Sequence, residues 1–486
     1  MKRLSFLFLI IVLILTLVAC SDSGGENENS SLQTGVLCIK NPVEEATKNQ
    51  VDNTTIEIKD ENNKVVVEGV GEHTLTAGTY KVVVTASGYE DWVNNECNVV
   101  AGQTLTISPE LIPEEIGAVE WEFTGSEGKL VSDVAVGSDG TIYFGDDNLY
   151  AVNPDGSEKW VYQTEAGTKY IYGPVIDNDN TVYFAARDKL YAINSDGSEK
   201  WILGTEVMST NQTPAIGEDG TIYTTFNLDT NDNGIVDQGF LYAINPEDGS
   251  KKWSYELSND SNLYTSSVTI GSDGAIYVTG FSLYVVNPDG IGKVLIDKSS
   301  GNYWYSPPAI GANNTLYVSM NDYDNNVTRL GAIDMEDQTL KWDIKVDEEY
   351  IIGIAIGEDG TIYTSGTNLS ARNPDGSIKW TFSGRMDLFT PLTLGNDGLI
   401  YIGSGINIED GYENSKIGIM YAINAEDGTE EWSFVAAGMS SPVIANDGTI
   451  YAGSDYLYAL EGGNVNLADT PWPMYRNNIR RTNGAN

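Results

Sequence analysis

The pattern of apolar and polar positions changes character along the chain. A predominantly apolar stretch runs from Leu4 to Val18, directly after the basic pair Lys2 and Arg3. A short apolar run behind a positive start is typical of a signal peptide. Beyond it, apolar and polar residues alternate in short stretches separated by turn residues, which predicts half-buried β-strands. The sequence therefore indicates an exported, all-β protein.

One pattern recurs from residue 117 to residue 486. Its first landmark is an aliphatic residue followed by a tyrosine, and these tyrosines are Tyr143, Tyr183, Tyr223, Tyr277, Tyr317, Tyr363, Tyr401 and Tyr451. Its second landmark is Leu-Tyr-Ala-Ile-Asn-Pro-Asp-Gly followed by a tryptophan. The framework tryptophans are Trp121, Trp160, Trp201, Trp253, Trp342, Trp380 and Trp432. Repeats of about 40 residues that each parse as four short strands with Asp-Gly turns predict a propeller. Eight copies predict eight blades.

The repeats also predict how the ring closes. The eighth copy supplies only three strands, and the segment from Ala118 to Phe123 carries Trp121 ahead of the first copy. We expect this first strand to complete the last blade, because closure removes exposed sheet edges. The second landmark is eroded at Leu330-Gly331 and Leu369-Ser370, and Val294 stands where a tryptophan is expected.

Two smaller parts precede the propeller. Residues 20–34 are polar and lack apolar periodicity, which predicts a flexible tether. Residues 35–113 predict a small β-sandwich, and alternation on both sides of Ala77-Gly78 predicts a hairpin there. Cys38 and Cys97 lie near the two ends of this segment, so a disulfide between them is plausible in an oxidising compartment.

Three segments resemble known families. Leu17-Val18-Ala19-Cys20 resembles the lipobox of bacterial lipoproteins. This resemblance implies a signal peptide over 1–19, lipidation of Cys20, and an anchor in the cell membrane or outer membrane with the body facing the periplasm or the exterior. An ordinary signal peptide or a membrane-anchor helix is the alternative, and both also export the protein.

The other two resemblances concern the folded parts. The stretch around Ala77-Gly78 resembles PEGA-type and carboxypeptidase-regulatory-like sandwich domains. The blades resemble pyrroloquinoline-quinone-type repeats, and Trp472-Pro473-Met474-Tyr475-Arg476 resembles a motif that closes such propellers. These resemblances imply the fold and leave function open, because one fold supports many functions.

The net charge excludes one class of partner. The whole chain has a formal charge of −43, and without Lys2 and Arg3 it has 25 basic and 70 acidic residues, a charge of −45. Such a surface repels phosphate backbones, so nucleic acid is not expected as a partner.

The insertions in the repeats indicate a binding face. The landmark tyrosines are spaced by 40, 40, 54, 40, 46, 38 and 50 residues, and the additions in blades three, five and seven fall between the second and third strands. In a propeller these loops share one face. The blade-three insertion resembles a calcium loop, with oxygen-bearing side chains at Asp229, Asn231, Asn233 and Asp237 around Gly234. Phe240 occupies the place of the usual bidentate acid. Calcium binding and a merely solvated acidic loop are both open interpretations.

Aromatic and acidic residues gather near the other insertions. The candidate ligand face consists of Tyr303, Trp304, Tyr305, Asp322, Asp324, Glu409, Asp410 and Tyr412. Aromatic rings beside carboxylates suit a glycan or a peptide strand, through stacking and hydrogen bonds. The alternative is that these rings only cover the mouth of the propeller.

The sequence gives little support to catalysis. Quinone-dependent dehydrogenases with this repeat use adjacent cysteines, whereas this propeller contains no cysteine, so pyrroloquinoline quinone is not expected. The sole histidine, His73, lies in the small domain, which excludes histidine-based triads within the propeller. We expect a non-catalytic, membrane-anchored scaffold that binds a protein or glycan. The alternatives are a component resembling the propeller lipoprotein of the outer-membrane protein assembly machine, a carboxylate-based glycan hydrolase, or a degenerate quinoprotein.

Overall fold

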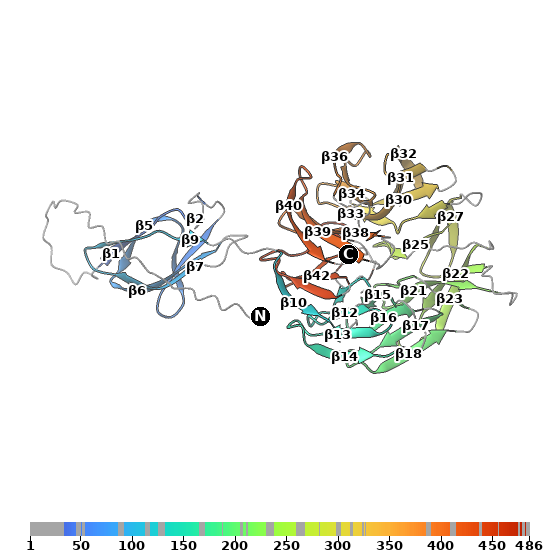
Figure 1. Cartoon of the computed structure of the whole chain (residues 1–486), viewed down its shortest axis with the longest axis horizontal. Helices are drawn as coiled ribbons and strands as arrows, with labels where there is room; N and C mark the ends of the chain where they lie inside the picture. The colour runs from blue at the N-terminus through green and yellow to red at the C-terminus, as the bar shows by residue number, and fades with distance from the viewer. Residues whose placement is uncertain are drawn as a thin grey trace. The chain divides into compact units, whose positions relative to one another are not determined.

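The fold is described from a computed structural model of the whole chain (Figure 1), which divides after Ile112 into two compact units. The structure describes residues 34–482 except 45–49, 51–53, 86–91, 112–116, 125–131, 165–170, 187, 205–207, 210–211, 230–237, 259–267, 281, 298–302, 312–313, 323–324, 326, 385–389, 409–414, 437–439, 455, 475–476 and 479–481. The signal peptide, Cys20 and the tether lie outside this part. Where the structure describes the chain, it is all-β, as predicted, and no helix there is long and apolar enough to cross a membrane.

The first unit contains two main sheets with apolar inner faces. One has the order β5-β1-β8, the other β4-β3-β6-β7, and β2 pairs with β9. These strands are β1 (Thr34–Ile39), β2 (Val43–Glu44), β3 (Thr55–Lys59), β4 (Val65–Glu68), β5 (Gly71–Thr76), β6 (Gly78–Thr85), β7 (Trp92–Val99), β8 (Thr104–Ile107) and β9 (Glu110–Leu111). Leu37, Ile58 and Val82 are fully buried, so alternate residues of each strand form the core.

The predicted hairpin at Ala77-Gly78 is wrong. β5 pairs with β1 in one sheet, whereas β6 pairs with β3 and β7 in the other. The chain therefore passes from sheet to sheet at this turn. Leu75 and Tyr80 are both buried. A strand pair that changes sheets keeps the same alternation as a hairpin, so the pattern alone does not distinguish them.

The two cysteines of this unit lie in different sheets. Cys38 is in β1 and Cys97 is in β7, and both are free thiols in the structure. The disulfide therefore stays a prediction. Burial raises the pKa of the Cys97 thiol to about 11.

The second unit is built from eight four-stranded antiparallel sheets within the described residues, in agreement with the predicted eight blades (Figure 1). Blades one to four contain β11 (Ala135–Val136), β12 (Ile142–Gly145), β13 (Leu149–Val152), β14 (Glu158–Tyr162); β15 (Ile171–Ile176), β16 (Val182–Ala186), β17 (Lys189–Ile193), β18 (Glu199–Gly204); β20 (Ala215–Ile216), β21 (Ile222–Leu228), β22 (Gln238–Ile244), β23 (Lys251–Ser258); and β24 (Thr269–Ile270), β25 (Ile276–Thr279), β26 (Leu283–Val286), β27 (Gly292–Ile296).

Blades five to eight follow the same order from inner to outer strand. They contain β29 (Ala309–Gly311), β30 (Thr315–Asp322), β31 (Val327–Asp334), β32 (Thr339–Val346); β33 (Ile351–Ile356), β34 (Ile362–Gly366), β35 (Leu369–Arg372), β36 (Ile378–Phe382); β37 (Thr393–Leu394), β38 (Leu399–Ile408), β39 (Ser415–Asn424), β40 (Glu430–Ala436); and β41 (Val443–Ile444), β42 (Ile450–Gly453), β43 (Leu457–Leu460), β10 (Val119–Phe123). Two further short strands, β19 (Met208–Ser209) and β28 (Tyr303–Tyr305), pair with β21 and β30.

The predicted closure of the ring is confirmed. β10 pairs antiparallel with β43, so the first strand of this unit is the outermost strand of the last blade. Its Trp121 packs against Tyr451 of the same blade, with ring centroids 5.7 Å apart. A strand from one end of the unit thus completes a sheet formed by the other end, which leaves no blade short of a strand.

The framework tryptophans join each blade to the next, as predicted. Trp201 is representative: it packs against Tyr183 of its own blade, and its Nε1 donates to the Pro246 carbonyl of the following blade at 2.8 Å. The same bond is made by Trp121, Trp160, Trp253, Trp342 and Trp380. We call this contact the indole latch. It explains the turn sequence, because Gly249 has φ +69° and a Cβ there would lie 2.8 Å from the Trp201 ring.

The chain after β43 returns across the inner strands. The backbone N–H groups of Ile216, Ile356 and Leu394 donate to carbonyls of Thr482, Trp472 and Pro473 at 2.8 to 3.0 Å. These three donors are the last residues of β20, β33 and β37, so the tail lies where strands one and two of blades three, six and seven are joined. We call this end of the ring the tail end and the opposite end the hairpin end.

Candidate functional site

Three long hairpins project at the hairpin end. The second and third strands have seven, eight and ten residues in blades three, five and seven, against four or five in the other blades. The register continues without a break from Leu399↔Asn424 to Ile408↔Ser415 in blade seven. The predicted position of the insertions, between the second and third strands, is therefore confirmed. The insertions therefore lengthen the paired second and third strands, and they do not form separate loops.

The blade-five hairpin is held from two sides. β28 pairs with its β30 strand, matching Tyr303 to Asp322 and Tyr305 to Met320. Asn321 is buried, and its side-chain oxygen accepts from the backbone N–H of Ile351 in blade six at 3.3 Å. These contacts fix the hairpin relative to the neighbouring blade before any ligand binds.

The structure brings together part of the predicted ligand face. Tyr303, Trp304 and Tyr305 form β28, which runs beside Asp322. The Asp322 carboxylate accepts from the backbone N–H of Asn325 at 3.1 Å, so it also forms the turn of this hairpin. The remaining predicted residues, Asp324, Glu409, Asp410 and Tyr412, lie outside the described residues.

The predicted calcium loop is described only at its start. Asp229 follows β21 directly and is half-buried, whereas Asn231, Asn233 and Asp237 lie outside the described residues. In the part of the chain that is described, no three His, Cys, Asp or Glu side chains come together as metal ligands. Calcium therefore stays a prediction.

A cavity that the sequence analysis did not predict lies at the tail end. It has a volume of about 1050 Å³ and is formed by blades two, three and four together with Asn478 and Thr482 of the tail. Its acidic lining residues are Asp177, Asp179, Glu218, Asp219 and Glu247. Turns of separate repeats form this cavity, so no local sequence pattern marks it.

The acids of this cavity also hold its turns. The Asp177 carboxylate accepts from the backbone N–H of Thr181 at 2.8 Å and from the Tyr183 hydroxyl at 3.0 Å. The Asp219 carboxylate accepts from the Thr221 N–H and hydroxyl. Burial acts to raise the pKa of Asp219, but these bonds and the Lys252 charge outweigh it, and the pKa is lowered. Both acids are thus turn-forming residues.

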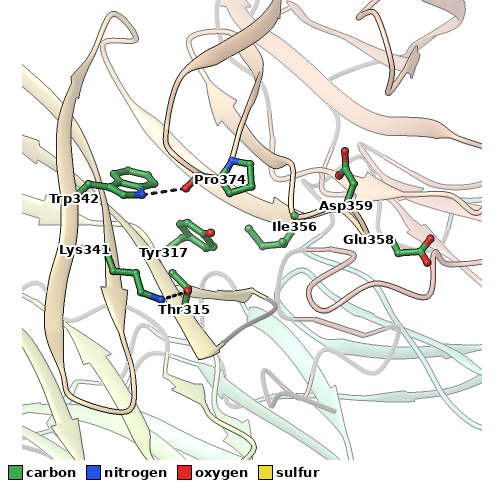
Figure 2. A pocket seen from close by; sticks show the side chains of 9 residues that line it. Thr315, Tyr317, Lys341, Trp342, Ile356, Glu358, Asp359 and Pro374 are labelled. Atoms are coloured by element: carbon green, nitrogen blue, oxygen red, sulfur yellow. Dashed lines mark hydrogen bonds between the residues drawn. The ribbon is translucent and has the colours of Figure 1, made fainter.

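A smaller cavity of about 320 Å³ lies at the seam of blades five and six (Figure 2). Figure 2 shows Trp342 reaching Pro374, whose carbonyl accepts from the indole at 3.0 Å, and Lys341 reaching Thr315 at 2.8 Å. These bonds are the indole latch and a tie within blade five. The cavity is therefore a space beside structural contacts.

Among the described carboxyl groups with a shifted pKa, only that of Glu120 is raised, by desolvation and by the charges of Glu461 and Asp447. The others form turns, and their pKa values are lowered; they are Asp139, Asp155, Asp196, Asp219, Asp248, Asp334, Asp359, Asp375 and Asp427. A general acid needs a raised pKa at neutral pH, so these turn acids are not suited to that role.

Two solved propellers are similar to this chain, and the first of them supports the fold. The solved "Structure of Dos1 propeller" is similar over 73% of this chain and 97% of that chain, with a TM-score of 0.52 and 11% identity. The "Crystal structure of WD40 beta propeller domain of Doa1" covers 71% of this chain and 96% of its own, with a TM-score of 0.44 and 11% identity. No curated protein matches the chain.

A protein-family comparison gives a match over most of the second unit. The family described as outer membrane protein assembly factor BamB matches residues 111–343 and 306–470. The two matches overlap and together span the blades described above. The chain therefore belongs to this family of repeat propellers.

Proposed function

We propose that this protein is a non-catalytic scaffold of the cell envelope that binds a protein partner at the hairpin end of its propeller. The observation that carries the proposal is the asymmetry of the ring: long hairpins of blades three, five and seven project at one end, while the tail covers the inner strands at the other. Loops and hairpins that vary on a constant scaffold are where propellers place binding functions.

The rigidity of the blade-five hairpin supports this proposal. Asn321 and Thr328 bind the backbone of the segment that enters blade six, and β28 pairs along the other side. A surface already ordered in the free protein loses little conformational entropy on binding. A protein partner is favoured over a glycan because the family described above is named for protein assembly.

Family membership favours a more specific second candidate. We propose that the partner belongs to the assembly of outer-membrane proteins, with the lipid on Cys20 holding the propeller at the membrane. Depleting the protein should then lower the amount of folded outer-membrane proteins. Unchanged levels of these proteins would exclude this candidate and leave the general scaffold proposal intact.

Site-specific photo-crosslinking in living cells tests the binding face. A photoreactive residue at Asn325, at the exposed turn of the blade-five hairpin, should give protein adducts. The same residue at Glu247, whose side chain is 79% exposed at the tail end, is the matched control. Adducts from Asn325 alone support the proposal. Adducts from Glu247 alone, or carbohydrate and no protein at Asn325, overturn it.

We also propose that the blade-three insertion takes up calcium, starting from Asp229, which leaves β21 at the hairpin end. Oxygen ligands around a central glycine suit this ion. Calorimetry of the whole protein should show uptake that Asp229→Ala and Asp237→Ala each abolish. The turn variant Asp155→Ala is the control and should keep it. Uptake that survives both loop substitutions, or no uptake by the wild-type protein, overturns this assignment.

A further inference from the structure

The seam between blades four and five departs from the rule that the other seams follow. In seven blades the outermost strand carries a tryptophan, which abuts the turn of the following blade. In blade four the sequence aligns Val294 with the tryptophans, but the register of β27 places Lys293 opposite Val285, where the other blades have the tryptophan. Blade four therefore has no indole to place against blade five.

The turn of blade five that would lie against such an indole also differs from the corresponding turns of the other blades. At the other seven seams, a glycine with positive φ lies against an indole, and a Cβ there would come within 2.6 to 3.3 Å of the ring. In blade five the corresponding residue is Gln338, with φ +58°. The turn keeps the positive φ of the other turns, but its residue carries a side chain where they have glycine. A Cβ fits because no ring occupies the space, so both ends of the latch are missing.

A second aromatic contact is also missing at this seam. At five of the other seven seams, a tyrosine of the third strand packs against an aromatic residue on the outermost strand of the preceding blade. These pairs are Tyr150–Phe123, Tyr191–Tyr162, Tyr284–Tyr255, Tyr421–Phe382 and Tyr458–Phe434, with ring centroids 5.4 to 6.5 Å apart. In blade five the third-strand position is Gly331, which has no side chain to offer. Blade five thus lacks both aromatic contacts to the outer strand of blade four.

What remains at the seam lies deeper in the ring. Met335 stands where other turns place the residue that accepts the indole bond, and its buried side chain reaches back to Gly271 of blade four. One apolar cluster joins Leu283, Leu316 and Trp472 across blades four and five and the tail, and β27 contributes only the partly buried Leu295 and Ile296 to it. The inner part of the seam is therefore packed, and the gap in the pattern is confined to the rim.

We infer that the ring opens at the rim between blades four and five, by release of β27, and not at the β10–β43 closure. Local opening is easiest where a strand has few buried contacts. β27 is bonded to β26 on one side and lacks an indole latch, whereas β10 carries Trp121 with its bond to Pro154. Release of β27 would uncover the edge of β26 and the side chains of Leu295 and Ile296, which pack against the core of this seam.

Hydrogen exchange measured by mass spectrometry on the intact protein tests this inference. After correction for intrinsic rates, amides of β27 should exchange at least about ten-fold faster than those of the outer strands β23 and β10. Lys293→Trp combined with Gln338→Gly should restore the latch and slow β27 by about ten-fold, with β23 unchanged, because Lys293 lies opposite Val285. Lys293→Trp alone should have a smaller effect, because the Gln338 side chain occupies the place of the ring.

If the repair variant does not fold, a second variant, which removes an existing latch, tests the same inference. Trp253→Val breaks the latch between blades three and four, so β23 should then exchange at the rate of wild-type β27. Equal protection of β27, β23 and β10 in the wild-type protein would overturn the inference. So would a folded repair variant in which β27 exchanges as fast as before.

Discussion

The substitution Gly249→Ala tests the indole latch where its geometry is most complete. Trp201 is buried, its indole donates to the Pro246 carbonyl at 2.8 Å, and the Gly249 turn lies against its face. A methyl group at residue 249 would lie 2.8 Å from both Cδ2 and Cε3 of the ring. Real carbon atoms do not approach so closely, so either the indole or the turn must move.

Two effects add to the cost of this substitution. Gly249 has φ +69°, and an L-residue in this conformation costs about 1 kcal/mol. Forcing an extra methyl group into a packed contact costs about 1 to 3 kcal/mol more. We therefore expect Gly249→Ala to lower the free energy of unfolding by about 2 to 4 kcal/mol.

The matched control is Gly398→Ala in a turn of blade seven. Gly398 has φ +81°, yet nothing lies within 4 Å of the position of its Cβ, so only the backbone cost of about 1 kcal/mol applies. Urea unfolding followed by tryptophan fluorescence measures both variants. Equal losses for the two variants would refute the latch, because the recurring glycine in these turns would then be explained by backbone conformation alone.

Three further outcomes follow from buried groups. Arg372 Nη2 lies 2.7 and 2.8 Å from the two Glu348 oxygens, and the side chains are only 9% and 4% exposed, so Arg372→Met should cost about 3 to 5 kcal/mol in urea unfolding. Adding Glu348→Leu should recover most of that loss, and a double variant no more stable than the single one would contradict this reasoning. Desolvation, with the charge of Asp139, raises the pKa of Tyr143 to about 12. Because its pKa is higher folded than unfolded, stability should be constant below about pH 10 and fall as the pH rises toward 12, and a urea midpoint that is flat over this range would disprove it. In the reduced protein at pH 8, a thiol reagent should label half-buried Cys38 well before Cys97, whose pKa burial raises to about 11, and equal labelling rates would count against this.

The sequence predicted the propeller well because each repeat carries its own contacts. A tyrosine, a tryptophan and a glycine at fixed offsets are the three parts of one latch, so their recurrence reports blade number, seam and ring closure together. Trp121 ahead of the first repeat was sufficient to predict the β10–β43 pairing. The insertions were also readable, because they lengthen one repeat without altering its landmarks.

Features that depend on distant segments were not predictable in this way. The turn at Ala77-Gly78 joins two sheets, but its alternation also fits a hairpin, and only packing of the whole unit decides between them. The tail-end cavity needs turns of three blades and Asn478 together. The buried Arg372–Glu348 pair did leave a signal: Arg372 replaces the aliphatic residue that precedes Asn in other repeats, which marks an unusual interior in blade six.

The contacts that stabilise the ring and the hairpins proposed to bind a partner lie at opposite ends of the ring. The indole latches depend on the turns that join strands three and four, as at Pro246 and Gly249, and those turns lie at the tail end. The long hairpins begin at the other end, beyond the last buried core positions, such as Ile402 and Ile419 of blade seven. Hairpin length can therefore change without disturbing a latch. This separation accounts for strict landmarks and variable insertions in the same repeat, and it places the binding of a partner where a change in sequence costs the fold least.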